Sequence, residues 1–512
     1  MAQPRFDLPP ESRFEDKGSP TLEKTNNVAP ESSSVVIGDV TIQTLKPFTT
    51  LSAIGIGYGV TNTAVGLLLV FGTALPMGGP PLVFWGFLVM AGVGLATATT
   101  LGELASAMPH PGGQYIWVNR LAAPRHRRFL SYITAIVSWL AAVATGASAC
   151  LSVPVGVCSI ISLLSPGFVY KKWMGFVGYQ ILNIITVLLA SFEHALPKIS
   201  RLMLLFSCTT IGIVFITLFA MSSTKTTAKD FFVNTVNVSG WPNGIAFIMG
   251  MNGANWSFSC LDVATHLAEE IPAPAKNIPR ALIWTIIIGF ASGLLVVLSV
   301  LINLDGIDGT ADNSGLTLFY RITGSKAAAA GLWVLVMITT AGAVWSIQTW
   351  QSRLAWTISR EGGFPFHRHL SKLSPAPFHT PTWSLIMSAA LTAIFGCLYL
   401  GSDLAFNSLI STGILLQYIS YSIPVILMLV RGRSQLQPGP FWYPKLGLLA
   451  NIIMLTWTLV ATVFYCFPSY LPVLTEQMNY ASVVLAAVAV VSTGLWFLFA
   501  KNNYEVKEIM DH

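Results

Sequence analysis

Charged residues are scarce in this chain. Asp, Glu, Lys and Arg make up only 10% of its 512 residues, whereas a soluble protein carries about 25%. Hydrophobic residues make up 53%. This imbalance excludes a soluble globular domain and predicts an all-α polytopic membrane protein, whose surroundings are the lipid bilayer.

Cysteine is also scarce and is poorly placed for chemistry. The six cysteines all fall in apolar stretches, and no two have CxxC spacing, so neither a zinc site nor a disulfide framework is indicated. The sequence lacks a phosphate-binding loop ending in GK[ST], which disfavours an ATP-driven pump. Residue arrangements for hydrolysis by Ser, Cys or zinc are missing too. We therefore expect no metal, no cofactor and no enzymatic activity.

Long apolar runs are what the chain has in abundance. Twelve of them are long enough, at about 20 residues, to cross a bilayer as helices. We predict one membrane domain over 47–500, between a disordered Pro-, Ser- and Glu-rich tail over 1–46 and a short tail over 501–512. The runs lie at 48–73, 82–107, 129–164, 176–192, 202–222, 243–267, 281–303, 332–357, 383–401, 404–430, 446–467 and 480–500.

Lys and Arg concentrate on one side of these runs. With all twelve runs taken as crossings, 22 of the 28 Lys and Arg residues lie on the side of the N-terminal tail. The positive-inside rule then puts both termini in the cytoplasm. The net charge of +6 follows from this topology and implies no nucleic-acid partner. A sequon at Asn237-Val-Ser239 falls in a predicted external loop, so Asn237 is a glycosylation candidate.

Two of the runs contain glycine interruptions, the first at Gly55–Gly59 and the sixth at 250–255. Glycine in membrane helices often marks close helix packing. Interruptions at corresponding positions of two halves, however, are typical of inverted-repeat transporters, whose exposed backbone binds substrate or ions. We therefore predict discontinuous first and sixth helices, repeats of five helices over 48–222 and 243–430, and two appended helices over 446–500. The substrate-binding candidates here are Gly55, Ile56, Gly57, Tyr58, Gly59, Asn252 and Gly253.

One carboxylate, Asp262, lies well inside the sixth run. An ionisable group at bilayer depth is costly and usually faces a protein interior or a watery path. Asp262 and His266 lie one helical turn apart, and Glu269 and Glu270 continue the same face. Asp262 could accept a proton or compensate a cationic substrate as the site opens and closes. Alternatively, it could be a structural carboxylate tied to Arg353.

The remaining acidic candidates lie at helix ends. Glu269 and Glu270 leave the sixth run and are expected to pair with Lys276 or Arg280. Glu103 ends the second run, where an ion pair with Arg120 or another basic gate residue is favoured over substrate contact. We assign Glu103, Glu269 and Glu270, with Asp262, to coupling or gating.

Aromatic residues flank both predicted breaks. Trp256 and Phe258 follow the second break, and Tyr58 lies inside the first. Aromatic faces attract ammonium groups by about 0.5–2 kcal/mol each, so these rings are candidates for substrate contact rather than ordinary packing. Trp345 and Trp350 in the eighth run are further candidates.

Four stretches together carry a family resemblance. They are GELASAMPHPGGQYIWVNRLAAP, AFIMGMNGANWSFSCLDVATHLAEEI, TWQSRLAWTISREGGFP and GPFWYPKLG. In this order, over roughly 47–500, they resemble the amino acid–polyamine–organocation superfamily and, within it, the fungal amino acid/choline transporter branch. WSFSCLDVATH is similar to fungal choline permeases, whereas the Glu269-Glu270 pair resembles amino acid and GABA permeases as much.

The resemblance implies a five-plus-five fold and alternating access, usually driven by a proton gradient. It maps the broken helices onto Gly55–Gly59 and 250–256, an acidic gate onto Asp262 and an aromatic contact onto Trp256. A lysine that some members carry in the fifth helix is absent here.

We predict a secondary active transporter that imports a small amine across a fungal plasma membrane. Choline or a related cation is the first candidate substrate, and GABA or another amino acid is the second. A passive facilitator or channel and a nutrient sensor stay open.

Overall fold

The computed structural model describes residues 32–37, 40–45, 49–192, 195–222, 225–304, 315–375, 378–475 and 478–506. From residue 49 onward the described elements are helical. Before them, β1 (Ser32–Ile37) and β2 (Val40–Leu45) form an antiparallel hairpin. A hairpin therefore occupies part of the tail predicted to lack structure. The predictions for 1–31 and for 507–512 lie outside the described residues.

Ten helical stretches among the described residues are long and apolar enough to cross a membrane. Nine predicted runs each coincide with one of them, the first two runs share the stretch Thr50–Ala107, and the sixth run is broken into short pieces. The single-run helices are α4 (Arg127–Leu164), α5 (Lys172–Ala190), α6 (Leu196–Ala220), α10 (Pro274–Leu301), α12 (Lys326–Arg360), α14 (Thr382–Gly401), α15 (Asp403–Arg431), α16 (Pro444–Phe464) and α17 (Ala481–Leu495).

The stretch Thr50–Ala107 contains α1 (Thr50–Thr61) and α2 (Thr63–Ala107). At 1.5 Å per residue, the 45 residues of α2 measure about 68 Å, more than twice the ~30 Å of a bilayer core. Gly79 interrupts α2 with φ +66° and ψ −162°, which only glycine adopts readily. Between α1 and α2, Asn62 has left-handed φ 37° and ψ 50°, a conformation in which asparagine is enriched.

The sixth run is built from three short pieces. They are α8 (Asn243–Gly250), α9 (Asn252–Ser257) and the 3₁₀ turn η2 (Leu261–Leu267). Between α9 and η2, Cys260 has left-handed φ 63° and ψ 34°. The two runs predicted to be discontinuous are thus both interrupted, and in each the interruption contains one non-glycine residue in the left-handed region.

The sixth run is interrupted between Gly250 and Asn252, within the predicted stretch, and again at Cys260, whereas the first run is interrupted later than predicted, at Asn62. Gly55, Gly57 and Gly59 lie inside α1, and Gly253 lies inside α9. A Cβ on Gly57 would lie 2.7 Å from Thr285 Oγ1, and one on Gly59 would lie 2.9 Å from Ser346 Oγ. These glycines therefore allow close packing against other helices, whereas the chain turns a few residues later, at Asn62 and Cys260.

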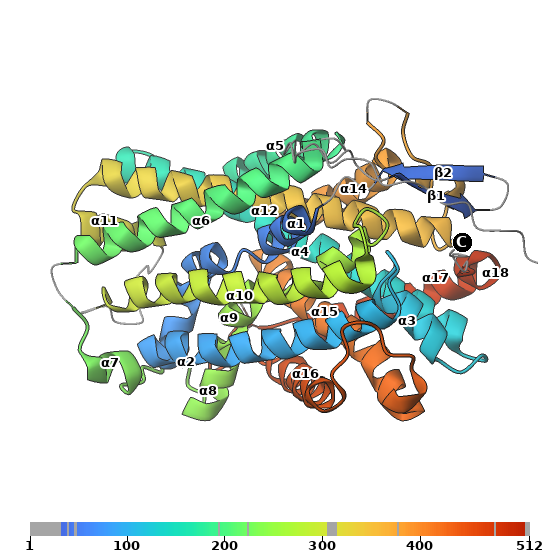
Figure 1. Ribbon diagram of the computed structural model, residues 1–512. Coiled ribbons are helices and arrows are strands. Elements are labelled where there is room, and N and C mark those ends of the chain that lie inside the picture. The colour runs from blue at the N-terminus through green and yellow to red at the C-terminus, as the bar shows by residue number, and fades with distance from the viewer. Residues whose placement is uncertain are drawn as a thin grey trace, which may run out of the picture.

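The long helices run roughly side by side (Figure 1). At one end of the molecule lie the hairpin, α3 (Gln114–Leu121) and α18 (Lys501–Asn503), and we call this the tail end. At the other, the far end, lie α7 (Ala228–Phe232) and α11 (Gly315–Thr323). In its apolar part, α15 is 67% buried and α17 only 17%, so α15 is central and α17 peripheral. The short elements α13 (His367–Leu370), η3 (Arg433–Gln435) and η5 (Trp496–Ala500) complete the helical set.

Candidate functional site

A cavity of about 480 Å³ lies on the far-end side of the two interruptions. We call it the outer cavity. Residues of α2, α4, α8, α9 and α15 line it, together with the segment that follows α16. Because α16 begins beside the tail-end residue Glu103, which accepts a hydrogen bond from Tyr443 N, its last residue, Phe464, lies toward the far end. The outer cavity therefore belongs to the far end.

A second, much smaller pocket lies where the two interruptions meet. This inner pocket is lined by Asn62 and Cys260 and holds about 20 Å³, which is room for about one water molecule. Leu69 and Trp256 line both spaces. Trp256 therefore lies between them, and its ring must move before a solute of several heavy atoms can occupy the inner pocket.

The walls of both spaces are uncharged. Among the described residues that line them, there is no Asp, Glu, Lys, Arg or His. Aromatic rings and small polar side chains provide the lining instead, with Trp333, Phe464 and Tyr465 around the outer cavity. A cationic solute would meet ring faces, which attract ammonium groups without a counter-ion.

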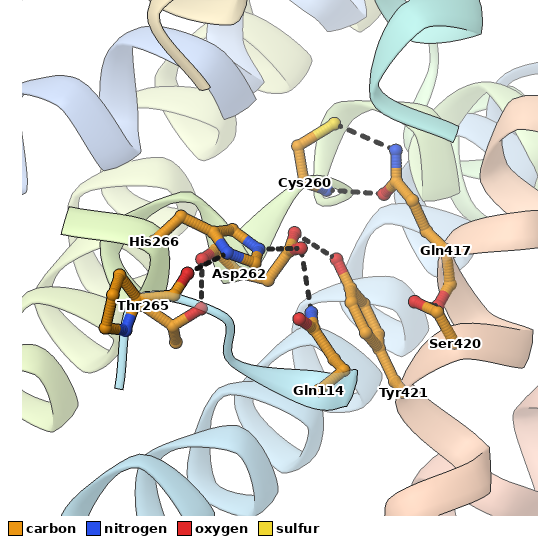
Figure 2. A network of polar contacts seen from close by, with 9 residues as sticks. Gln114, Cys260, Asp262, Thr265, His266, Gln417, Ser420 and Tyr421 are labelled. Carbon is orange, nitrogen blue, oxygen red and sulfur yellow. Dashed lines mark hydrogen bonds and ion pairs between the residues drawn. The ribbon is translucent and has the colours of Figure 1, made fainter. Parts of the chain in front are cut away.

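Gln417 of α15 holds the second interruption in place. Its Oε1 accepts a hydrogen bond from Cys260 N at 2.8 Å, and its Nε2 lies 3.2 Å from Cys260 Sγ (Figure 2). Its Nε2 also donates to Thr145 Oγ1 on α4 at 3.0 Å. The interruption removes Cys260 N from a helical ladder, and inside a membrane no solvent can replace the lost partner. Gln417 supplies that partner and links the interruption to α4.

Asp262 lies on the tail-end side of Cys260 and is fully buried. Tyr421 OH donates to Oδ1 at 2.6 Å, Gln114 Nε2 donates to Oδ2 at 2.8 Å, and His266 Nε2 lies 3.0 Å from Oδ2 (Figure 2). These partners come from α15, α3 and η2. The carboxyl group therefore joins three elements at the tail end, and Arg353, its predicted partner, is elsewhere.

The contact between Asp262 and His266 requires one hydrogen. His266 Nδ1 lies 2.8 Å from Pro111 O. A carbonyl oxygen can only accept, so Nδ1 carries a hydrogen. The remaining contact, Nε2 to Oδ2 at 3.0 Å, is a hydrogen bond only if one hydrogen lies between the two atoms. In this geometry the pair therefore shares one proton, either as imidazolium with carboxylate or as imidazole with carboxylic acid.

Three ion pairs close the tail end around this pair. Glu103 pairs with Arg433 at 2.9 Å, Glu270 with Arg353 at 3.1 Å, and Glu269 with Arg360 at 2.9 Å. The predicted partners Lys276 and Arg280 are therefore wrong, whereas Glu103 does form an ion pair with a basic residue, Arg433 in place of Arg120. The reason is that α12 and η3 bring arginines from distant parts of the sequence to these carboxylates, which spacing along the chain does not reveal.

His110, in the connection between α2 and α3, is a neutral neighbour of the pair. Burial, followed by the charges of Arg360, Arg120 and His266, lowers the pKa of His110 to about 3. Its Nδ1 accepts a hydrogen bond from Gly112 N at 2.9 Å, which requires an unprotonated nitrogen. His110 therefore stays neutral at physiological pH.

The other predicted site residues divide between cavity and packing. Asn252, Gly253 and Trp256 line the outer cavity. Tyr58 is buried and bonds to Ser292 Oγ at 3.0 Å, and Phe258 packs on Phe87 with ring centroids 5.5 Å apart. Also buried, and outside the lining of both spaces, are Gly55, Ile56, Gly57, Trp345 and Trp350.

The glycosylation candidate Asn237 is engaged in the folded protein. Its Nδ2 donates to Trp241 O at 2.7 Å and to Asn243 Oδ1 at 3.0 Å. Ser239, the third residue of the sequon, is buried. Glycosylation of Asn237 stays a prediction, and the glycan would have to be attached before Asn237 forms these hydrogen bonds.

Several functional residues were not singled out from the sequence: Asn62, Cys260, Gln417, Gln114 and Tyr421. A usable signal existed for Asn62, because it is a lone amide inside an apolar run, and for Gln417, which lies in the middle of one. A buried amide usually has hydrogen-bond partners that fix it. Gln114 carried no such signal, because it is the first residue of a short amphipathic helix.

Fold and site together define a multi-pass membrane transporter, with interrupted helices around a pocket open toward one end. The family model for amino acid permeases matches residues 48–489. The chain belongs to this family, a member of the amino acid–polyamine–organocation superfamily, and is therefore a transporter and not an enzyme.

Named relatives agree with this assignment. The transmembrane transporter swnT of Metarhizium robertsii is 64% identical over 490 residues, 96% of this chain and 97% of that protein. The swainsonine transporter swnT of Arthroderma benhamiae is 66% identical over 470 residues, 92% and 94% of the two chains. The choline transporter of Saccharomyces cerevisiae is 35% identical over 486 residues, 93% and 86%.

Proposed function

We propose that this chain is a secondary active transporter that carries a small hydroxylated amine, swainsonine first, across the plasma membrane. The observation that carries the proposal is the uncharged path from the outer cavity past Trp256 to the inner pocket at Asn62 and Cys260. The similarity of 64% and 66% to the two swnT transporters, over nearly the whole chain, supports swainsonine.

Choline is the second candidate. It was favoured by the sequence, and the choline transporter of Saccharomyces cerevisiae is 35% identical to this chain. The aromatic rings around the outer cavity suit a quaternary ammonium group. The higher identity to the swnT transporters places choline second.

The arrangement we propose is twelve crossings as a five-plus-five inverted repeat with two appended helices. Asn62 and Cys260, the two left-handed residues, interrupt the first crossing of each repeat. Ten helical stretches become twelve crossings in two steps. Thr50–Ala107 is divided at Gly79 into two crossings, and α8, α9 and η2 together form one more. Both termini are then cytoplasmic, in accordance with the excess of Lys and Arg at the tail end.

In this orientation the described state faces outward. The outer cavity is open toward the far end, while three ion pairs and the Asp262 contacts close the tail end. Swainsonine, a bicyclic amine with several hydroxyl groups, would enter from outside and would reach the inner pocket once Trp256 swings aside. Release would follow when the tail-end contacts break, which is alternating access.

Proton coupling would act through Asp262 and His266. Both contacts of His266, with Asp262 and with Pro111 O, exist when the pair shares one proton. Without that proton the neutral imidazole has one N–H and can keep only one of the two contacts. Loss of the proton therefore favours opening of the tail end. The neighbouring titratable groups are Tyr421, Cys260 and His110, and Arg353 and Arg360 are paired with Glu270 and Glu269.

Uptake of labelled swainsonine tests the function. Permease-deficient yeast that expresses the chain should accumulate swainsonine above its external concentration, and a protonophore should abolish the accumulation. Uptake that stops at equal concentrations would establish a facilitator instead. Absence of uptake above vector-only cells for swainsonine, choline and GABA alike would overturn the transport proposal.

A further inference from the structure

We infer that the solute path is lined by hydrogen-bond acceptors and therefore selects amines that carry N–H and O–H donors over quaternary ammonium ions. The inference rests on the proposed function and narrows its substrate class. It is drawn from the direction of hydrogen bonds along the lining rather than from the similarity to other transporters.

Three hydroxyl groups of the outer cavity, on Thr73, Ser152 and Ser159, have already used their hydrogens on backbone carbonyls. Thr73 Oγ1 donates to Val70 O at 2.7 Å. On α4, Ser152 Oγ donates to Ser148 O at 3.2 Å and Ser159 Oγ donates to Val155 O at 2.9 Å. A hydroxyl has one hydrogen and two lone pairs, so each of these groups presents only lone pairs to a solute. If one of these hydroxyl groups rotated to donate to a solute, it would lose its hydrogen bond to the backbone carbonyl.

Hydroxyl groups that line the inner pocket also donate to backbone carbonyls. Thr145 Oγ1 donates to Ala141 O at 2.9 Å, Ser259 Oγ to Trp256 O at 2.7 Å, and Thr340 Oγ1 to Val336 O at 2.8 Å. Ser and Thr in membrane helices commonly bond backward in this way. Here, however, these hydroxyls come from three different elements and line one pocket. Acceptors therefore follow the solute path on several sides.

The side-chain amides of Asn479 and Asn252 present further acceptors in the outer cavity. Asn479 uses both amide hydrogens on backbone carbonyls, of Tyr465 at 2.7 Å and of Phe467 at 3.0 Å. Asn252 Oδ1 is buried, lies on the cavity wall and accepts no hydrogen bond from the described residues. An unpartnered buried acceptor is unfavourable unless a solute satisfies it.

Buried donors complement these acceptors. Trp333 Nε1 and Tyr465 OH have no hydrogen-bond partner among the described residues, and both side chains line the outer cavity. A solute hydroxyl can accept from Trp333 and donate to the lining at the same time. A quaternary ammonium group can do neither, and choline has a single hydroxyl.

The decisive comparison uses two solutes that differ by one methyl group. Dimethylethanolamine is protonated at neutral pH and keeps one N–H, whereas choline, its N-methyl derivative, has none. In competition against labelled swainsonine, dimethylethanolamine should inhibit at a concentration about tenfold lower than choline, the ratio expected for one hydrogen bond to a charged donor. Equal inhibition, or stronger inhibition by choline, would overturn the inference.

Variants separate this inference from the transport proposal. Ser152→Ala with Ser159→Ala removes two acceptors and should bring the inhibition ratio toward one, with the amount of chain at the cell surface as the check on folding. Ser162→Ala, on the same helix but exposed and outside the cavity lining, is the control and should keep the full ratio. A full ratio in the double variant would contradict the role of these serines. Loss of all uptake in the unmodified chain would instead reject the transport proposal.

Discussion

Asp262 and His266 are the pair of residues through which we propose that a proton acts. They meet at 3.0 Å with a carbonyl fixing the far side of the imidazole ring. Hydrogen bonds to charged groups contribute about 1.5–3 kcal/mol each. In the proposed coupling, loss of one proton would weaken the closed tail end by an amount of this order.

Asp262→Asn tests the shared proton. The asparagine amide can donate to His266 Nε2 and so reproduces the protonated acid at every pH. We expect slower uptake whose rate depends less on external pH than that of the unmodified chain. Initial uptake rates at constant external swainsonine measure this.

A control variant separates the pair from its neutral neighbour. His110→Gln should keep the pH profile of the unmodified chain, because the pKa of His110 is already lowered to about 3. A pH profile in Asp262→Asn identical to that of the unmodified chain would contradict the shared proton.

Trp256 is the residue whose ring separates the two spaces. Trp256→Ala removes the ring face and should reduce uptake by more than about tenfold, whereas Trp256→Phe keeps a ring and should retain much of it. Trp383→Ala, at a side chain that is 55% exposed toward lipid, should have little effect. Equal losses in both Trp256 variants would argue against an aromatic contact.

Gln417 is a structural residue at the same site. Gln417→Ala leaves Cys260 N without an acceptor in a buried position, which costs about 1–3 kcal/mol. We expect a lower thermal unfolding midpoint in detergent and reduced uptake. Gln180→Ala removes one half-buried bond, to Ala393 O at 3.1 Å, and should have a smaller effect. An unchanged unfolding midpoint in Gln417→Ala would show that the interruption at Cys260 keeps its conformation without Gln417.

Interrupted helices are the elements that create the inner pocket. Asn62 and Cys260 are non-glycine residues at positive φ, 37° and 63°. Such conformations cost about 1–3 kcal/mol and cluster at functional sites. Both residues lie at interruptions and on the wall of one pocket, so we expect this backbone strain to serve solute binding.

Cys260→Gly and Cys260→Val test that strain. Glycine adopts φ 63° freely and should leave the unfolding midpoint equal or higher, whereas β-branched valine should lower it markedly. Thermal unfolding of the purified chain in detergent measures both. If the valine variant had the same unfolding midpoint as the glycine variant, the backbone at residue 260 would not be left-handed in the working protein.

Sequence predicted the elements better than their interruptions. Apolar length alone placed the helices, and glycine pairs correctly indicated which two runs are broken. The exact turns were missed because glycine serves two purposes: Gly57 and Gly59 permit close packing, while an asparagine makes the turn. The same limit applied at the site, where Asp262 stood out as a buried charge but its partners Gln114 and Tyr421 come from distant elements.

Across the whole molecule, one end is open and the other is closed. The tail end is held by charged contacts between segments far apart in sequence, such as Glu103 of α2 with Arg433 after α15. The outer cavity has no described charge on its walls. In the proposed transport cycle, charges would act at the gate, and uncharged acceptors and aromatic rings would act on the solute.

Arg433→Ala tests closure of the tail end. It leaves the fully buried carboxylate of Glu103 with only the Tyr443 N–H at 2.8 Å. Removal of one partner of a buried pair can cost about 3–5 kcal/mol, and partial exposure of Arg433 reduces this. We expect a shift toward a state open at the tail end, seen as weaker swainsonine binding from outside. Pairing Arg433→Ala with Glu103→Gln should restore part of the affinity, and no restoration would contradict a gate role.

The most direct test follows the accessibility of one outer-cavity residue. In a chain with its six native cysteines replaced, Ser152→Cys should react rapidly with a membrane-impermeant thiol reagent applied outside intact cells. Swainsonine should slow this reaction at the concentration that half-saturates uptake. A cysteine at residue 152 that reacts equally fast with and without swainsonine, or only from the cytoplasmic side, would contradict the proposed solute path.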